Sequence, residues 1–171
     1  YNFLRGGAAI NVLARQAGAR VVIIDAGVAA PLAPAEGLID GKVASGTADM
    51  SLGPAMTPAQ AHQALALGVR VAQEEIARGL DLLACGEMGI GNTSPATAII
   101  ATFTGRAPLE ITGPGTGLAS PAVRLKADVI ARSLAVNQPD PENGLDVLTK
   151  VGGFEIGAMA GAMLAAAAAR I

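Results

Sequence analysis

Aromatic residues and clustered positive charge are both scarce in this sequence of 171 residues. It has no tryptophan, one tyrosine and three phenylalanines, and its 12 lysines and arginines are set against 14 aspartates and glutamates. Proteins that bind nucleic acids usually present a basic stripe, often with aromatic side chains on which bases stack. We therefore expect no nucleic-acid partner.

Cysteine and long apolar runs are also scarce. Cys85 is the only cysteine, so no internal disulfide is possible, and a reducing cytoplasm is the simplest compartment. Residues 1–8 lack a signal-peptide layout. The uncharged stretch 156–169 is shorter than the roughly 20 apolar residues of a membrane-spanning helix. We expect a cytoplasmic protein with no membrane partner, in which this stretch is a packed helix with Gly157 and Gly161 on one close-contact face.

Small aliphatic residues and glycine replace the missing aromatics. Hydrophobic residues are 51% of the chain and 22 residues are glycine, which suits helices packed closely on buried parallel strands. Apolar periodicity and caps predict helices at 6–18, 57–79, 95–105, 121–136, 144–153 and 154–168, and strands at 21–25 and 80–85. This alternation is typical of an α/β fold with a mostly parallel sheet.

Three of these helices carry specific expectations. In the helix at 6–18, we expect an apolar face and a C-terminal stop at Gly18. Thr57 and Pro58 predict the N-cap and first residue of the second helix, and Ser94 and Pro95 do the same for the third. The apolar face of the first helix is predicted to hold Ile10, Leu13, Ala14 and Ala17.

The stretch CGEMGIGNTSPATAI, residues 85–99, has the parts of an anion site. Its three glycines let backbone N–H groups turn inward, Thr93 and Ser94 add hydroxyl donors, and the following helix presents its positive end. A phosphate suits such a site, whereas Glu87 would repel phosphate and suits sugar hydroxyls. The alternative is an ordinary strand-to-helix turn with caps and a solvated glutamate.

Each of the other candidate binding residues can also be interpreted without a ligand. The loop ITGPGTG, residues 111–117, suits close approach of a ligand or is a simple turn. Lys126 or Arg124 could supply the cation that a phosphate needs, or both could be solvated helix charges. Asp25 and Asp49 resemble ribose-binding acids, or cap turns.

His62 and Cys85 are the remaining chemically versatile residues. His62 lies in mid-helix with no acid nearby in sequence, so we interpret it as a surface or half-buried histidine. Cys85 ends an apolar strand with no local histidine, so we interpret it as a small buried residue. Histidine, cysteine and carboxylates show no metal-ligand spacing, and we expect no metal.

Four motifs resemble one known family in its own order: FLRGGAAINVLARQAGARVVIIDAGV (3–28), GEMGIGNTSPATAI (86–99), GPGTGL (113–118) and NQPDPENGLDVLTKVGGFEIGAMAGAMLAA (137–166). Together they resemble the nicotinate-nucleotide–dimethylbenzimidazole phosphoribosyltransferases over nearly all of the chain. The resemblance implies a Rossmann-like α/β fold, with a mostly parallel sheet and flanking helices, in a homodimer that needs no cofactor.

The resemblance also implies an activity and a site. Phosphoribose would move from nicotinate mononucleotide to 5,6-dimethylbenzimidazole, giving nicotinate and α-ribazole 5′-phosphate for the lower ligand of cobalamin. Glu87 matches a family glutamate that supports the ribose and the transition state, and Lys126 matches a lysine near the phosphate. The other matched substrate-binding residues are Gly89, Gly91, Asn92, Thr93 and Ser94 in the phosphate loop, and Gly113, Gly115, Thr116 and Gly117 in the second loop.

The sequence departs from the family at its two ends. The family's general base is a glutamate beyond the segment that matches Ile171, and part of its acceptor pocket precedes the segment that matches Tyr1. We expect residues 1–171 to be a single α/β nucleotide-binding domain, the core of a larger protein, without the family's terminal helical segments. The alternatives are a truncated or degenerate relative that binds a phosphoribosyl nucleotide without catalysis, and an unrelated α/β enzyme acting on a sugar phosphate.

Overall fold

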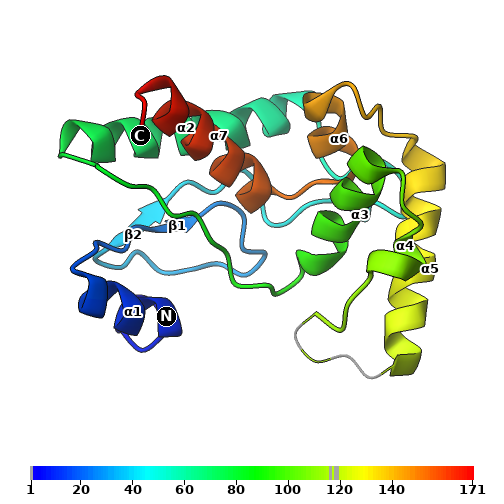
Figure 1. The fold of residues 1–171 in the computed structure, drawn as a ribbon, viewed down its shortest axis with the longest axis horizontal. Helices are drawn as coiled ribbons and strands as arrows, with labels where there is room; N and C mark the ends of the chain where they lie inside the picture. The colour runs from blue at the N-terminus through cyan, green and yellow to red at the C-terminus, as the bar shows by residue number, and fades with distance from the viewer. Residues whose placement is uncertain (1, 116, 118–119) are drawn as a thin grey trace. The chain divides into compact units, whose positions relative to one another are not determined.

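The computed structural model describes residues 2–115, 117 and 120–171. The chain divides into two compact units, Tyr1–Gly46 and Thr47–Ile171, whose elements are drawn in Figure 1. A parallel sheet and a set of helices occur together, so the predicted α/β fold class is confirmed. The prediction of a single nucleotide-binding domain over residues 1–171 stays a prediction.

The smaller unit pairs a short helix with a small parallel sheet. α1 (Ala9–Ala17) ends as predicted at Gly18, whose left-handed backbone (φ 67°) turns its N–H back onto the last carbonyl groups of the helix. β1 (Ile23–Asp25) lies parallel to β2 (Leu38–Asp40) in the sheet that the described residues form. The strand predicted at 21–25 is therefore confirmed in its last three residues.

The apolar face predicted for α1 forms, since Ile10, Leu13, Ala14 and Ala17 all lie in the helix, but it is mostly exposed. Ile10 and Leu13 are 46% and 60% exposed, whereas Asn11 and Ala14 are buried. Asn11 turns inward because its Oδ1 accepts a hydrogen bond from the N–H of Ala8, at 3.2 Å. The buried side of the helix, with Asn11 and Ala14, is therefore not its most apolar side.

In the larger unit, the longest helix begins as the sequence predicts. α2 (Pro58–Ala77) has Thr57 as its N-cap. The Thr57 hydroxyl accepts a hydrogen bond from the N–H of Gln60 at 3.2 Å, and the Gln60 side chain accepts one from the N–H of Thr57 at 2.9 Å. This reciprocal pair satisfies donors that the first turn of a helix otherwise leaves free.

α7 (Phe154–Ala168) packs along α2 (Figure 1). Glycines on both helices make this contact, as the predicted small-residue face requires. A Cβ on Gly68 of α2 would overlap the backbone of Ala158, and one on Gly161 of α7 would overlap the backbone of Leu65. The two helices are therefore in backbone contact.

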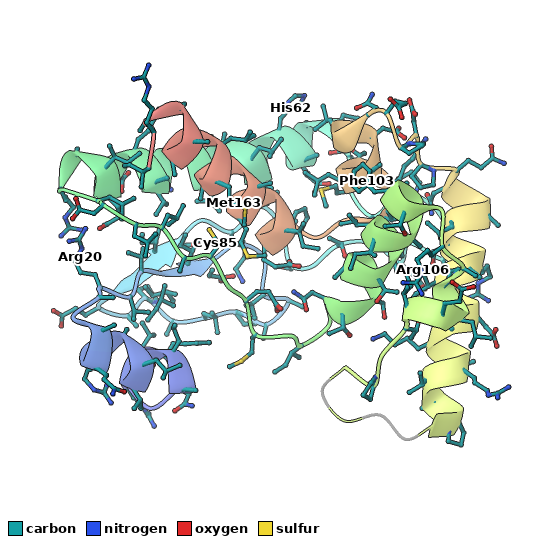
Figure 2. The ribbon with its side chains drawn as sticks, in the orientation of Figure 1. Arg20, His62, Cys85, Phe103, Arg106 and Met163 are labelled. Carbon is teal, nitrogen blue, oxygen red and sulfur yellow. The ribbon has the colours of Figure 1, made fainter. Side chains whose placement is uncertain are left out.

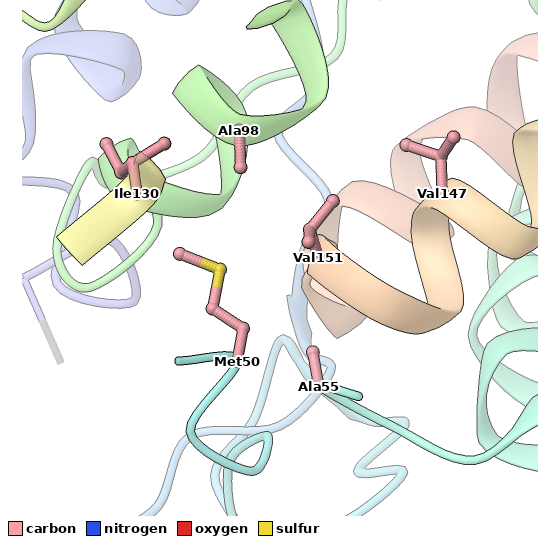
Figure 3. Close-up of a cluster of buried hydrophobic side chains, with 6 residues drawn as sticks. All are labelled: Met50, Ala55, Ala98, Ile130, Val147 and Val151. Atoms are coloured by element: carbon pink, nitrogen blue, oxygen red, sulfur yellow. The ribbon is translucent and has the colours of Figure 1, made fainter. Parts of the chain in front are cut away.

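Four more helices build the rest of this unit: α3 (Thr93–Thr104), α4 (Pro108–Ile111), α5 (Ser120–Asn137) and α6 (Gly144–Val151). α3, α5 and α6 share a core with Met50 and Ala55 from the segment before α2, as Figure 3 shows. Ile130, Val147 and Val151 are at most 1% exposed. The core thus ties α3, α5 and α6 to the 50–55 segment, and these elements carry the candidate site.

The strand predicted at 80–85 is wrong. The segment has no regular structure and pairs with no strand in the described part of the chain, and Leu82 is 82% exposed. A strand requires a partner for its backbone groups, and an aliphatic run does not reveal whether one is present. Among the described helices none is both long and apolar enough to cross a membrane, and α7 has 15 residues.

Candidate functional site

The loop of residues 86–92 leads into α3 and needs glycine at two points. Gly89 and Gly91 have φ values of 75° and 81°, a left-handed conformation that other residues rarely adopt. Glu87 is exposed, and its Oε2 accepts a hydrogen bond from the N–H of Gly89. The glutamate therefore stabilises its own turn, while its contact with a sugar stays a prediction.

α3 begins two residues earlier than predicted, with Asn92 as N-cap and Pro95 at its third position rather than its first. Proline fits there because N–H groups in the first turn have no partner inside the helix. The first intrahelical bond runs from the N–H of Ala96 to the carbonyl of Asn92, at 3.0 Å. The N–H groups of Thr93 and Ser94 thus remain for another partner, at the positive end of the helix dipole.

Asn92 adds an unpaired acceptor to this helix start. Its side chain is 7% exposed, and its Oδ1 has no hydrogen-bond partner among the described residues. Buried polar atoms are nearly always paired, so an orphaned acceptor marks a place where a donor is required. The residue lies between Gly91 and Thr93, within the segment predicted to bind a phosphate.

Three separate segments meet at Thr93. The Nζ of Lys126, on α5, donates a hydrogen bond to the Thr93 hydroxyl at 2.7 Å. In the second glycine-rich loop, Gly115 has φ 58°, and a Cβ there would lie 3.0 Å from the Thr93 Oγ1 and 3.4 Å from the Lys126 Nζ. The structure therefore brings together the phosphate loop, the second loop and the lysine that the sequence predicted to share a site.

The Lys126 ammonium is partly withdrawn from water. This desolvation lowers the pKa of Lys126 from its usual value near 10.5. A partly desolvated ammonium gains more from an anion than a solvated one does, since the intervening medium screens it less. Of the other residues predicted in the second loop, Gly113 and Gly117 are exposed, and Thr116 lies outside the described residues.

A cavity of about 230 Å³ opens beside the start of α3. Gly91 and Ser94 line one side, and Thr47 and Asp49 line another. Asp49 Oδ1 accepts a hydrogen bond from the N–H of Ser51 at 2.9 Å. That N–H, followed by the Ser51 hydroxyl, lowers the pKa of Asp49, so the carboxylate is ionised at neutral pH.

Asp25 caps a turn, which is the second of the two roles that the sequence predicts for it. Its Oδ1 accepts hydrogen bonds from the N–H groups of Gly27 and Val28, and its Oδ2 lies 3.0 Å from the Nζ of Lys42. Burial acts to raise the pKa of Asp25, but the Val28 N–H and the Lys42 ammonium together lower it. These contacts occupy both carboxylate oxygens and hold the loop after β1.

The other candidates have ordinary surroundings. His62 is exposed on α2 and Arg124 is exposed on α5 (Figure 2 labels the histidine). Cys85 is partly buried, and this burial raises the pKa of its thiol, which disfavours the reactive thiolate. Over the described ranges, no group of three or more histidine, cysteine, aspartate or glutamate side chains could hold a metal ion.

Sequence reasoning missed the anchors of the Asp49 turn. Arg132 and Asn137 of α5 both bond to this turn, from 81 and 87 residues further along the chain. The only local signal is the Asp49–Ser51 spacing, because aspartate commonly accepts from the N–H two residues ahead. Contacts over such separations leave no pattern in a single sequence.

Comparisons with known proteins identify relatives of this chain. A family model described as a phosphoribosyltransferase matches residues 1–171. A nicotinate-nucleotide–dimethylbenzimidazole phosphoribosyltransferase from Roseiflexus castenholzii is 55% identical over 170 residues, which cover 99% of this chain and 48% of the relative. A protein of the same name from Desulforudis audaxviator is 54% identical over 171 residues, which cover 100% of this chain and 48% of the relative.

A solved structure is similar over the same range. The crystal structure of CobT from Thermus thermophilus has a TM-score of 0.91 and 45% identity, over 98% of this chain and 50% of that one. The chain thus spans about half the length of the relatives that it matches. Because the family match takes in every residue and the two curated relatives are identical at more than half of the aligned positions, the chain belongs to the nicotinate-nucleotide–dimethylbenzimidazole phosphoribosyltransferase family.

Proposed function

We propose that this chain is the nucleotide-binding part of an enzyme that transfers phosphoribose from nicotinate mononucleotide to 5,6-dimethylbenzimidazole. The products would be nicotinate and α-ribazole 5′-phosphate. The observation that carries the proposal is the meeting of Thr93, Gly115 and Lys126 at the start of α3. The names of the relatives supply the two substrates.

The helix start suits the phosphate of the mononucleotide. The N–H groups of Thr93 and Ser94 lie at the positive end of α3, and the Lys126 ammonium is already held against the Thr93 hydroxyl at 2.7 Å. Charge-assisted bonds from an ammonium and from backbone N–H groups hold phosphate more strongly than neutral ones do. Gly89, Gly91 and Gly115 keep the surrounding backbone open to it.

Holding the phosphate would fix the sugar for the chemical step. As the bond between ribose and nicotinate breaks, positive charge builds up on the ribose, and the benzimidazole nitrogen attacks the same carbon. Fixed contacts at the phosphate reduce the entropy lost in reaching this geometry, and a nearby carboxylate stabilises the charge. Glu87 is the residue that we propose for this electrostatic role, with Asn92 and the second-loop residues Gly113 and Gly117 lining the site.

The attacking benzimidazole must also lose a proton, which requires a general base. We propose that the base is outside residues 1–171 and that the mononucleotide binds here without it. We further propose that the protein works as a cytoplasmic homodimer and without a cofactor.

The test is a calorimetric titration of the folded chain with nicotinate mononucleotide, followed by an assay for nicotinate release when dimethylbenzimidazole is added. We expect binding with a dissociation constant between micromolar and millimolar, and little release by this chain alone. Absence of binding by the folded chain would contradict the proposal. Adenosine 5′-monophosphate serves as the matched control ligand, since it carries the same ribose phosphate with a different, uncharged base.

A further inference from the structure

The cavity beside α3 has one carboxylate among the described residues that line it, and that carboxylate is Asp49. Glu87, the acid that the family resemblance assigns to the sugar, is exposed and is bound to the N–H of Gly89 in its own loop. Both acids are exposed, and they differ in whether they line this cavity. Asp49 faces the space that Gly91 and Ser94 share, whereas Glu87 does not line it.

The turn that carries Asp49 is fixed to α5 at two points. Arg132 Nη2 donates a hydrogen bond to the Ser51 hydroxyl at 2.9 Å, and Asn137 Nδ2 donates one to the carbonyl of Met50 at 2.6 Å. Ser51 is 3% exposed, and the Met50 side chain is part of the hydrophobic core. Such anchoring keeps the Asp49 carboxylate in place without a ligand, which is the condition for a precise binding contact.

α5 also carries residues of the proposed phosphate site and of the cavity. The same helix carries Lys126, which bonds to Thr93, and Val129, which lines the cavity one turn further on. Lys126 and the anchors of the Asp49 turn thus belong to one helix, and both contact the region around the start of α3. A ligand that reached both would need a phosphate for the lysine and hydrogen-bond donors for the carboxylate.

The chemistry of Asp49 restricts what those donors can be. Because its carboxylate is ionised, it only accepts hydrogen bonds, and it repels phosphate. A sugar phosphate offers an anion and neighbouring hydroxyl donors in one molecule. We propose that Asp49 accepts hydrogen bonds from the ribose hydroxyls of the bound nucleotide, an assignment that rests on the proposed function.

The test compares Asp49→Asn with the unchanged chain for three ligands: nicotinate mononucleotide, ribose 5-phosphate and inorganic phosphate. Asparagine keeps an oxygen for the N–H of Ser51 but removes the charge, so the turn should persist. We expect the dissociation constants of both ribose ligands to rise about tenfold, the usual scale for a charged hydrogen bond, and that of inorganic phosphate not to rise. Asp128→Asn, an exposed acid on α5, is the matched control and should change none of them.

Two results would overturn the assignment while leaving the proposed function intact. If Asp49→Asn binds ribose 5-phosphate as well as the unchanged chain does, the carboxylate does not meet the hydroxyls. If only nicotinate mononucleotide is weakened, the carboxylate faces the positively charged pyridinium ring instead. If the unchanged chain binds no ribose ligand, both the proposed function and this inference are contradicted. Asp49→Ser, which also keeps an acceptor for the turn, replaces the first variant if thermal unfolding shows that Asp49→Asn does not fold.

Discussion

Gly161 in α7 and Gly115 in the loop before α5 both make room for a neighbouring group, but the groups differ. At Gly161 the neighbour is the backbone of Leu65 in α2, and at Gly115 it is the Thr93 hydroxyl and the Lys126 ammonium. One glycine therefore serves helix packing, and the other keeps polar groups accessible. A glycine-rich sequence thus contains two kinds of glycine. Substitution of the first kind should lower the stability of the fold, and substitution of the second kind should lower the affinity for the ligand.

The largest effect is expected for Gly161→Ala. The new Cβ would overlap the Leu65 backbone, so α2 and α7 would have to move apart, and overpacking of this kind costs about 3 kcal/mol of unfolding free energy. Denaturant titration measures the loss. Gly144→Ala, at the first position of α6 with open space around it, is the control and should be neutral or slightly stabilising. Equal stability of the two variants would show that the helix contact is not tight.

Lys126→Ala should affect the ligand more than the fold. Removing the ammonium takes away a charge-assisted phosphate contact, so binding of nicotinate mononucleotide should weaken by about 2 kcal/mol, or roughly thirtyfold. Calorimetry measures this change. Arg124→Ala, an exposed cation on the same helix, should bind as the unchanged chain does. If the arginine variant loses affinity and the lysine variant does not, the cation has been assigned to the wrong residue.

Gly115→Ala, compared with a second glycine variant, separates the effect of backbone strain from the effect of crowding neighbouring side chains. Alanine at φ 58° costs about 1 kcal/mol, and its Cβ would press on Thr93 and Lys126. Gly105→Ala meets the same strain at φ 67° but has nothing within 4 Å. Both variants should lose about the same stability by thermal unfolding, while only Gly115→Ala should bind the mononucleotide several-fold more weakly. Matching affinities would mean that Gly115 is an ordinary turn glycine.

The smallest effect is expected for Glu87→Gln. Glutamine can still accept from the N–H of Gly89, and Glu87 does not line the cavity beside α3, so affinity for the mononucleotide should change by less than about threefold. Titration under the same conditions as for Asp49→Asn gives the direct comparison. A larger loss for Glu87→Gln than for Asp49→Asn would return the ribose contact to Glu87.

Sequence reasoning succeeded where the cause is local. Thr57 and Pro58 give the start of α2 correctly because an N-cap and its first turn are set by neighbouring residues. Gly18 ends α1 for the same reason. The tight face of α7 also follows from local spacing, since Gly157 and Gly161 are four residues apart on one side of a helix.

It failed where the cause lies elsewhere in the chain. Residues 80–85 read as a strand, but pairing decides a strand, and no partner lies among the described residues. The meeting of Thr93 and Lys126 came from the family resemblance rather than from any pattern, because the two residues are 33 positions apart. For Asp49 the sequence leaves a ribose-binding acid and a turn cap both open, since its anchors on α5 become visible only in the folded chain.

The central claim is that phosphate binds where α3, the second glycine-rich loop and Lys126 meet. The most direct measurement is a titration of the isotope-labelled chain with nicotinate mononucleotide, followed by the NMR shifts of backbone N–H groups. The account predicts the largest shifts at Thr93, Ser94 and Gly115, and their loss in Lys126→Ala. Saturable binding with its largest shifts away from the start of α3 would contradict it.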